Sequence, residues 1–281
     1  AAWGRAGQQP DVFAAIRLYA PTTGPGNVST LTPQSLGNPD LKPEVGEELE
    51  LGFDAGLLDD RVSLNLTYYS KKTKDAIVQK AVAPSVGFPG FQFVNLGELK
   101  NRGLEIGLDA QVLTGGAVAW DFGVTMSTND NEVVSLGGLP PIVFGSQEHR
   151  EGYPIGSLFY FKVLSASLDA SGNVVNALCD YGQGGQVPCA QAPRVFLGRS
   201  TPKLEASFTT TVTLWRRLKL YGLVDLKTGH MIENGDIGAS HLTFKNSEAI
   251  NRAEDPILLA YDQFAFRNGA SFMKAGFAKL R

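Results

Sequence analysis

Apolar and polar residues alternate along two neighbouring stretches of the chain, residues 47–57 and 62–68. In the first stretch the odd-numbered positions from Leu49 to Leu57 are apolar, and the even-numbered positions are acidic or glycine. In the second stretch the even-numbered positions from Val62 to Tyr68 are apolar, with serine, asparagine and threonine between them. Successive side chains of a strand point to opposite faces, so this period of two predicts two strands, each with one apolar and one hydrophilic face.

The alternation recurs in four further stretches, which predict four more strands: 104–112, 118–126, 204–214 and 218–226. The predicted strands are joined in pairs by short turns at 57–61, 113–117 and 214–218. Between the pairs lie long stretches rich in Gly, Pro, Asn and Ser, at about 79–101, 129–203 and 228–276, which we expect to be irregular. Short turns at one end of a sheet and long loops at the other are typical of outer-membrane β-barrels.

The length of the predicted strands agrees with a membrane span. At ~3.3 Å per residue and a tilt of about 45°, residues 47–57 cover about 25 Å of the membrane normal. Hydrocarbon offers the backbone no hydrogen-bond partners, so a membrane sheet closes on itself with its apolar side chains outward. The predicted fold is therefore an all-β, antiparallel transmembrane barrel with short periplasmic turns and long extracellular loops. We expect one set of carboxylates to face the lumen: Glu48, Glu50, Asp54, Glu105 and Asp109.

A soluble β-sandwich is the alternative, because its strands also alternate apolar and polar residues. Strand length and loop asymmetry favour the barrel, since sandwich strands usually have about five or six residues. Strand-end aromatics fit interfacial girdles, although aromatic residues also pack elsewhere; they are Tyr68, Tyr69, Trp120 and Trp215.

The segment "YYSKKTKDAI" interrupts the alternation with Lys71, Lys72 and Lys74 at the loop end of a strand. One interpretation is a polar rim that contacts lipopolysaccharide phosphates or an incoming substrate. The other is a solvated extension of the strand above the bilayer, which is the more usual meaning of a charge run.

The chain has 281 residues and a formal net charge of −3. With this charge the chain lacks the excess of Lys and Arg that is typical of nucleic-acid-binding proteins. The 32 glycines suit strands and loops better than helices. No apolar run reaches the roughly 18 residues of a transmembrane helix. The first residues lack the features of a signal peptide, and we expect the chain to be a fragment.

Two cysteines, Cys179 and Cys189, flank a polar loop rich in Gly and Gln. Their spacing does not match a zinc site. A disulfide fits better and implies an oxidising compartment, while two free thiols are the alternative.

No pattern of residues predicts catalysis, a cofactor or a metal site. His149, His230 and His241 all lie in predicted loops and lack a metal-ligand spacing. An aromatic stretch, "GYPIGSLFYFK", can either stack on a ligand or pack a loop, and packing is the commoner role. Its members are Tyr153, Phe159, Tyr160 and Phe161.

Several segments resemble one family, in order along nearly the whole chain. "NPDLKPEVGEELELGFDAGLLDDRVSLNLTYYSKKTKDAI" is similar to the mid-barrel signature of TonB-dependent outer-membrane receptors. "NLGELKNRGLEIGLDAQVL", "WDFGVTMSTNDNEVVSLGG", "EGYPIGSLFYFKVLSA" and "LGRSTPKLEASF" resemble segments of their SusC/RagA-like branch. "AAWGRAGQQP" resembles the end of a preceding strand, and "GASFMKAGFAKLR" a segment leading into another strand.

This resemblance implies a barrel of 22 strands with an N-terminal plug, which imports a bulky nutrient such as an oligosaccharide or peptide. Residues 1–281 would be part of the barrel domain, with the plug and the C-terminal strands outside them. The implied partners are outer-membrane lipid and lipopolysaccharide, TonB through the N-terminal part, and a SusD-like surface lipoprotein. A non-transporting structural or adhesion barrel and a secreted β-sandwich binding module are the alternative functions.

Overall fold

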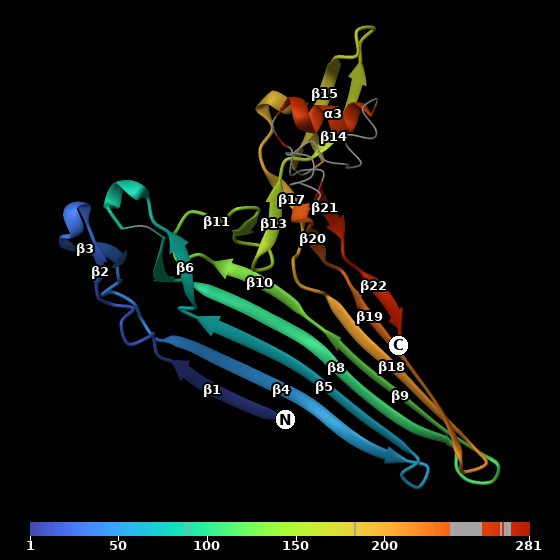
Figure 1. Cartoon of the computed structure of the whole chain (residues 1–281). Helices are drawn as coiled ribbons and strands as arrows, with labels where there is room; N and C mark the ends of the chain where they lie inside the picture. Colours follow the sequence, from blue (N-terminus) through green and yellow to red (C-terminus); the bar gives the residue numbers. More distant parts are fainter. Residues whose placement is uncertain (89, 183, 237–254, 265, 267–270) are drawn as a thin grey trace. The chain divides into compact units, whose positions relative to one another are not determined.

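A computed structural model describes residues 1–88, 90–182, 184–236, 255–264, 266 and 271–281. Within these residues nine strands form one sheet, in the order β1-β4-β5-β8-β9-β18-β19-β22, with β10 paired to β8 (Figure 1). We call this sheet the wall. Its strands are β1 (Ala2–Gln8), β4 (Glu44–Leu57), β5 (Val62–Lys74), β8 (Glu98–Leu113), β9 (Val118–Thr128), β10 (Asp130–Ser135), β18 (Leu204–Leu214), β19 (Leu218–Thr228) and β22 (Phe277–Leu280).

All six predicted strands are confirmed, and three short turns join them in pairs. The pairing of β4 with β5 is antiparallel and runs without a register shift from Val45↔Lys74 to Leu57↔Val62. The turn between them holds Leu58, Asp59 and Asp60 at φ values of 56°, 54° and 60°. Left-handed turn residues match the right-handed twist of the two strands, and aspartate tolerates this conformation better than most side chains.

The chain divides into two compact units, which are described separately here. The first contains the wall and comprises Ala1–Ile155, Leu204–Leu226 and Ala278–Arg281. The second comprises Gly156–Lys203 and Lys227–Phe277. The assignment of the whole chain to one barrel domain stays a prediction.

The prediction that the long stretches are irregular is wrong, because short hairpins and helical turns fill much of them. In the first unit these elements are β2 (Leu18–Thr23), η1 (Pro25–Asn27), β3 (Ser29–Ser35), β6 (Ile77–Ala81), η2 (Pro84–Val86), β7 (Phe91–Asn95), β11 (Ile142–Phe144) and β12 (Gln147–His149). Strands this short carry too few residues for a readable alternation. They are held by contacts that are distant in the sequence.

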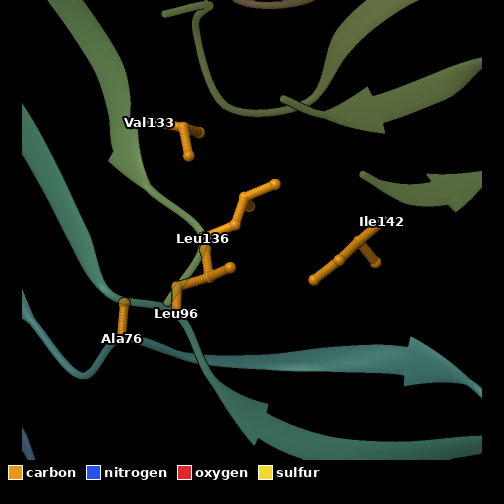
Figure 2. Packing of buried hydrophobic residues seen from close by; sticks show 5 residues of the cluster. All are labelled: Ala76, Leu96, Val133, Leu136 and Ile142. Atoms are coloured by element: carbon orange, nitrogen blue, oxygen red, sulfur yellow. The ribbon is translucent and has the colours of Figure 1, made fainter. Parts of the chain in front are cut away.

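A small apolar core stabilises these hairpins (Figure 2). Its buried members are Ala76, Leu96, Val133, Leu136 and Ile142. Leu96 and Val133 are completely buried. Full burial of a side chain of this size contributes about 1.5–3 kcal/mol. The loops next to the wall therefore have an organised core of their own.

Asn95 ties two of these loops together through its side-chain amide. Its Nδ2 donates to the carbonyl oxygens of Lys42 (2.9 Å) and Asp75 (2.7 Å), and its Oδ1 accepts from the Lys42 amide (2.8 Å). Nearby, Asn38 Nδ2 donates to the Phe93 carbonyl oxygen at 2.9 Å. Because backbone groups in loops need partners as much as those in strands, these amides fix the loop that precedes β4 against the β6–β7 hairpin.

In the second unit short strands and one described α-helix occur together. The elements are β13 (Ser157–Tyr160), β14 (Val163–Leu168), β15 (Val174–Gly182), β16 (Gly185–Pro188), η3 (Cys189–Gln191), β17 (Val195–Gly198), β20 (Met231–Glu233), α3 (Pro256–Gln263) and β21 (Phe272–Lys274). Asp255 caps α3 by accepting from the amides of Ile257 (2.9 Å) and Leu258 (3.3 Å). Among the described residues, no helix is long and apolar enough to cross a bilayer.

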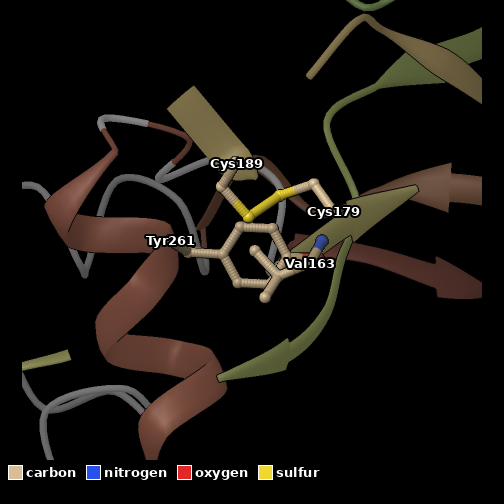
Figure 3. Close-up of a disulfide and its surroundings, with 4 residues drawn as sticks. All are labelled: Val163, Cys179, Cys189 and Tyr261. Atoms are coloured by element: carbon tan, nitrogen blue, oxygen red, sulfur yellow. A yellow bond between two sulfur atoms is a disulfide. The ribbon is translucent and has the colours of Figure 1, made fainter. Parts of the chain in front are cut away.

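A disulfide lies at the centre of this second unit (Figure 3). The Sγ atoms of Cys179 and Cys189 are 2.02 Å apart, and both residues are buried. Tyr261 of α3 packs beside them, and its hydroxyl accepts from the Val163 amide at 3.1 Å. The cross-link and this hydrogen bond join β14, β15 and α3 into one small core.

Candidate functional site

The register of the wall sorts its side chains onto two faces. Phe53 lies opposite Leu66, which in turn lies opposite Ile106. One position along, Asp54 lies opposite Asn65, and Asn65 opposite Gly107. Residues directly opposite each other in an antiparallel pair share a face, and the next residue along each strand points to the other face. The strands therefore align their apolar positions on one face and their hydrophilic positions on the other.

All five carboxylates expected to face a lumen lie on this hydrophilic face. They are Glu48, Glu50 and Asp54 of β4, with Glu105 and Asp109 of β8. The same face continues onto β9 and β18, because Glu105 lies opposite Ser127 and Ser127 opposite Glu205. The structure thus brings the predicted residues together. That this face borders a lumen stays a proposal.

Two concave patches lie on the hydrophilic face. One, of about 420 Å³, includes Glu105, Glu205 and Gly107 in its lining. The other, of about 340 Å³, includes Asp109, Asp121 and Gly123. Both patches are lined largely by hydroxyl, amide and carboxylate side chains. Gly107 and Gly123 contribute no side chain, and polar neighbours lie over them: a Cβ at Gly107 would meet Asn65 Oδ1 at 3.1 Å, and one at Gly123 would meet Thr209 Oγ1 at 2.5 Å.

Some polar groups of the hydrophilic face bind each other. Asn65 Nδ2 donates to Asp54 at 2.6 Å, and Ser207 Oγ donates to Asp225 at 2.9 Å. Lys71 forms an ion pair with Glu48, with 3.6 Å between Nζ and Oε2. Within the described part of the chain, Glu105 makes no ion pair. This face therefore offers hydrogen-bond acceptors to whatever occupies the space beside it.

Tyr69 lies on the hydrophilic face, so its assignment to an aromatic girdle is wrong. It lies opposite Glu50 on one side and Gly103 on the other. Its ring covers Gly103, and its hydroxyl donates to the Thr128 carbonyl oxygen at 3.2 Å. The ring fills the space that the glycine leaves. The hydrogen bond of the hydroxyl links Tyr69 of β5 to the backbone of β9. Counting strand positions from Tyr68, an apolar-face residue, would have found this orientation.

The apolar face leaves large side chains exposed, with 53% of Phe53 and 46% of Leu51 accessible. A contiguous surface of this kind marks a contact with a membrane or another apolar partner. Trp120 belongs to the same face, and its indole Nε1 donates to Thr210 Oγ1 at 2.9 Å. This bond satisfies the one polar group of the indole, which suits a side chain in an apolar environment.

The aromatic residues of the second unit serve its internal packing. Phe159 is 1% exposed, and its ring lies 5.6 Å from that of Phe196. Tyr160 contacts Phe161, with 5.5 Å between ring centroids, and Phe161 stacks on Phe266 at 3.9 Å. These contacts support the packing role for three of the four loop aromatics.

Arg194 fastens this aromatic group to the backbone. Its Nη2 donates to the Phe159 carbonyl oxygen at 2.7 Å, and its guanidinium lies 5.5 Å from the Tyr160 ring centroid. Burial raises the pKa of Tyr160, and the positive charge of Arg194 partly opposes that shift. The fourth loop aromatic, Tyr153, belongs to the other unit and is partly exposed, and its carbonyl oxygen accepts from the Val133 amide at 2.9 Å.

Among the described residues there is no group of three or more His, Cys, Asp or Glu side chains that could hold a metal ion. His241 lies outside the described residues. His149 of β12 packs against Phe144, with ring centroids 5.6 Å apart, and burial lowers its pKa.

Comparison with known proteins gives one consistent result. Residues 1–229 match the family described as "TonB dependent receptor-like, beta-barrel". TonB-dependent receptor P26 of Formosa agariphila is 28% identical over 234 residues, covering 76% of this chain and 24% of the relative. TonB-dependent receptor SusC of Bacteroides thetaiotaomicron is 29% identical over 145 residues, covering 48% of this chain and 14% of the relative. The chain thus spans a quarter or less of these relatives' length.

Among solved structures, the RagAB peptide importer in its closed-closed state is similar over 99% of this chain and 33% of that chain. The TM-score is 0.74 at 20% sequence identity. A second structure, of the RagAB peptide transporter, gives a TM-score of 0.73 with the same 99% coverage. At this level of identity the likeness establishes the fold.

Proposed function

Since the chain belongs to the TonB-dependent receptor-like β-barrel family of the outer membrane, we propose that it forms part of the wall of an active importer. Its apolar face contacts the lipid and its hydrophilic face borders the lumen. The observation that carries this proposal is the register of the wall, which aligns Phe53 with apolar neighbours and Asp54 with polar ones across successive strands. A closed barrel of about 22 strands, the number that the family resemblance implies, would require further strands beside β1 and β22.

The proposed cargo is a bulky polar nutrient, either a peptide or an oligosaccharide. A peptide is the cargo named for RagAB, whose fold this chain shares. The hydroxyl and carboxylate side chains of the two concave patches support a polar cargo, because they offer acceptors for amide or hydroxyl donors. The proposed partners are TonB, acting through a part of the receptor outside this chain, and a SusD-like surface lipoprotein.

Import is tested with the full-length receptor in its source organism. A strain that lacks the gene is given a peptide mixture or an oligosaccharide mixture, and uptake of each is followed. We expect one of the two uptakes to fall, and to fall equally when TonB is inactivated. Unchanged uptake of both cargoes would favour a non-transporting barrel.

The orientation of the wall is tested separately with single cysteines on neighbouring positions of β8. Glu105→Cys and Leu104→Cys are placed in a full-length receptor whose native cysteine pair stays oxidised, and a water-soluble maleimide is applied. We expect Glu105→Cys to react and Leu104→Cys to be protected by lipid. Reaction of Leu104→Cys alone would reverse the assignment of the two faces.

A further inference from the structure

A small pocket of about 250 Å³ lies at the loop end of the wall, away from the short turns (Figure 1). Its lining comes from the end of β1 and the turn after it, from the first residue of β4, and from the β6–β7 hairpin. Gln8 and Glu44 of this lining lie opposite each other in the wall. Glu44 is an even-numbered position of β4, as Glu48 and Asp54 are, so the pocket borders the hydrophilic face.

Unlike the two concave patches, this pocket has a mostly apolar lining. The β6–β7 hairpin explains why apolar side chains are available there. Val78 and Val94 lie opposite each other and pack against the small apolar core, so the next residues along each strand point to the other face of the hairpin. Two half-buried side chains of that second face, with two residues of the segment after β1, form the apolar part of the lining: Pro10, Ala14, Ile77 and Phe93.

Hydrogen bonds hold the walls of the pocket in place. The amide of Asn38 donates to the Ala14 carbonyl oxygen at 2.8 Å, and its Nδ2 donates to the Phe93 carbonyl oxygen at 2.9 Å. One residue thus ties the segment after β1 to the β6–β7 hairpin. The Ile77 amide donates to Glu44 Oε2 at 3.0 Å, which ties the same hairpin to β4. A ligand that enters this pocket therefore needs little ordering of the protein, which favours binding.

Glu44 adds a hydrogen-bond acceptor to the apolar lining. Its Oε2 accepts from the Ile77 amide. Among the described residues, its Oε1 accepts no hydrogen bond and its carboxylate makes no ion pair. A carboxylate can accept at both oxygens, so one acceptor is open beside the apolar walls. An apolar side chain next to an N–H donor, as in a residue of a peptide, matches this combination.

We propose that the pocket binds one apolar side chain of a peptide cargo, whose backbone N–H donates to Glu44. The inference rests on the proposed function, because it takes the hydrophilic face as the side that meets the cargo. It narrows the cargo to a peptide with apolar side chains. Pockets that hold drug-sized ligands have about 300–1,000 Å³. A pocket of about 250 Å³ suits a smaller group, such as the side chain of one leucine or phenylalanine.

An oligosaccharide fits the pocket less well. A sugar ring carries hydroxyl groups on most of its carbons, and apolar walls would leave several of them without partners, which is costly. The two concave patches offer more hydroxyl and carboxylate side chains to a sugar. Another loop of the full-length receptor is the second alternative occupant. The two alternatives give different outcomes in the test below.

The test measures peptide binding to the full-length receptor, purified in mild detergent. The probes are fluorescent pentapeptides, Ala-Ala-Xaa-Ala-Ala, whose central residue is leucine, phenylalanine or serine. Burial of a large apolar side chain is worth about tenfold to a hundredfold in Kd. We expect the wild-type receptor to bind the leucine and phenylalanine peptides at least about tenfold more tightly than the serine peptide.

The variant is Phe93→Ala, with Phe91→Ala as its matched control. Phe93→Ala removes a ring from the pocket and keeps the carbonyl oxygen that Asn38 binds, so the preference for apolar peptides should fall by about three- to tenfold. Phe91 lies two residues earlier on the same strand, outside the lining, and its ring is 5.6 Å from that of Phe144. Phe91→Ala should keep the wild-type preference.

Equal binding of the three peptides by the wild-type receptor, or no measurable binding of any, would overturn the inference. So would a Phe93→Ala variant that binds cellohexaose more weakly and the peptides as before. If Phe93→Ala lowered the unfolding midpoint more than Phe91→Ala and both kept the same peptide preference, another loop would fill the pocket, and the inference would also fall. Because the assay measures binding and not uptake, an importer whose pocket takes no side chain stays distinguishable from a barrel that imports nothing.

Discussion

Replacing Phe53 by arginine distinguishes between two surroundings of the apolar face, lipid and water, because the expected loss of stability differs. Phe53 lies at the middle of the apolar positions of β4, opposite Leu66, and 53% of it is exposed. In water only the covered half of the ring contributes to folding, so the substitution would cost about 1 kcal/mol. At the middle of a bilayer an arginine costs about 2–4 kcal/mol. The expected loss is therefore 2–4 kcal/mol, roughly 30-fold to several hundredfold in the folding equilibrium.

The matched control is Thr125→Arg. Thr125 lies opposite Gly107, which lies opposite Asn65, so it is at the level of Asp54 on the hydrophilic face. This substitution adds the same side chain to an exposed position beside water and should change stability by about 0.5 kcal/mol or less. The full-length receptor is folded into phosphatidylcholine vesicles, and urea titration gives the free energy of unfolding for each form. A large loss in Thr125→Arg with none in Phe53→Arg would refute the assignment of faces.

Three other perturbations test particular contacts. Cys189→Ser should destabilise the disulfide core by about 3 kcal/mol, from the size of the closed loop, and hasten proteolysis within residues 156–203; unchanged proteolysis would contradict this. Gly103→Val should lower the receptor's unfolding midpoint sharply, because its side chain would collide with the carbonyl oxygen of Thr128. Gly46→Val is the control, since a Cβ there meets its nearest neighbour at 3.7 Å. Burial lowers the pKa of His149, so the folded loop favours its neutral form. That stability is full above the ordinary pKa of about 6.5 and is lost as the pH falls through the lowered value. Hydrogen exchange over residues 142–149 should therefore quicken in acid relative to His149→Gln, and equal profiles would contradict it.

The strands of the wall were predictable because each of them alternates apolar and polar residues, one set on each face of the sheet. Each long strand meets apolar surroundings on one side and polar groups on the other, so the pattern is repeated in residues 49–57 and again in 62–68. The exposed apolar side chains that would be a fault in a soluble protein, such as Phe53, are the consequence of the same alternation. The pairing of β4 with β5 and of β8 with β9 followed from the short turns, because a tight connection holds two antiparallel strands side by side.

The loops were not predictable in the same way. Their hairpins depend on single distant contacts, such as the amide of Asn95 that binds the backbone of Lys42 and Asp75. The helix α3 is short and is held by the Tyr261 hydroxyl against Val163, a partner 98 residues away in the sequence. Neither contact leaves a periodic signal, since only the folded chain brings its two members together.

Charge runs show most clearly what a register adds to a pattern. In the sequence alone, Lys71 and Lys72 are neighbouring lysines of one charge run, and a single role for both is the natural interpretation. Pairing sets Lys71 opposite Glu48 and Lys72 opposite Glu47, so Lys71 lies on the hydrophilic face and Lys72 on the apolar face. The free-energy cost of leaving the two charges unpaired then differs. A cation next to water is solvated without a partner, whereas a cation next to an apolar surrounding needs an opposite charge. The same alternation places Arg102 on the apolar face and Tyr69 on the hydrophilic face. If a reagent confined to the lipid labelled cysteines at positions 71 and 72 of the full-length receptor equally, the separation of faces at this end of the wall would be wrong, even with every strand correctly placed.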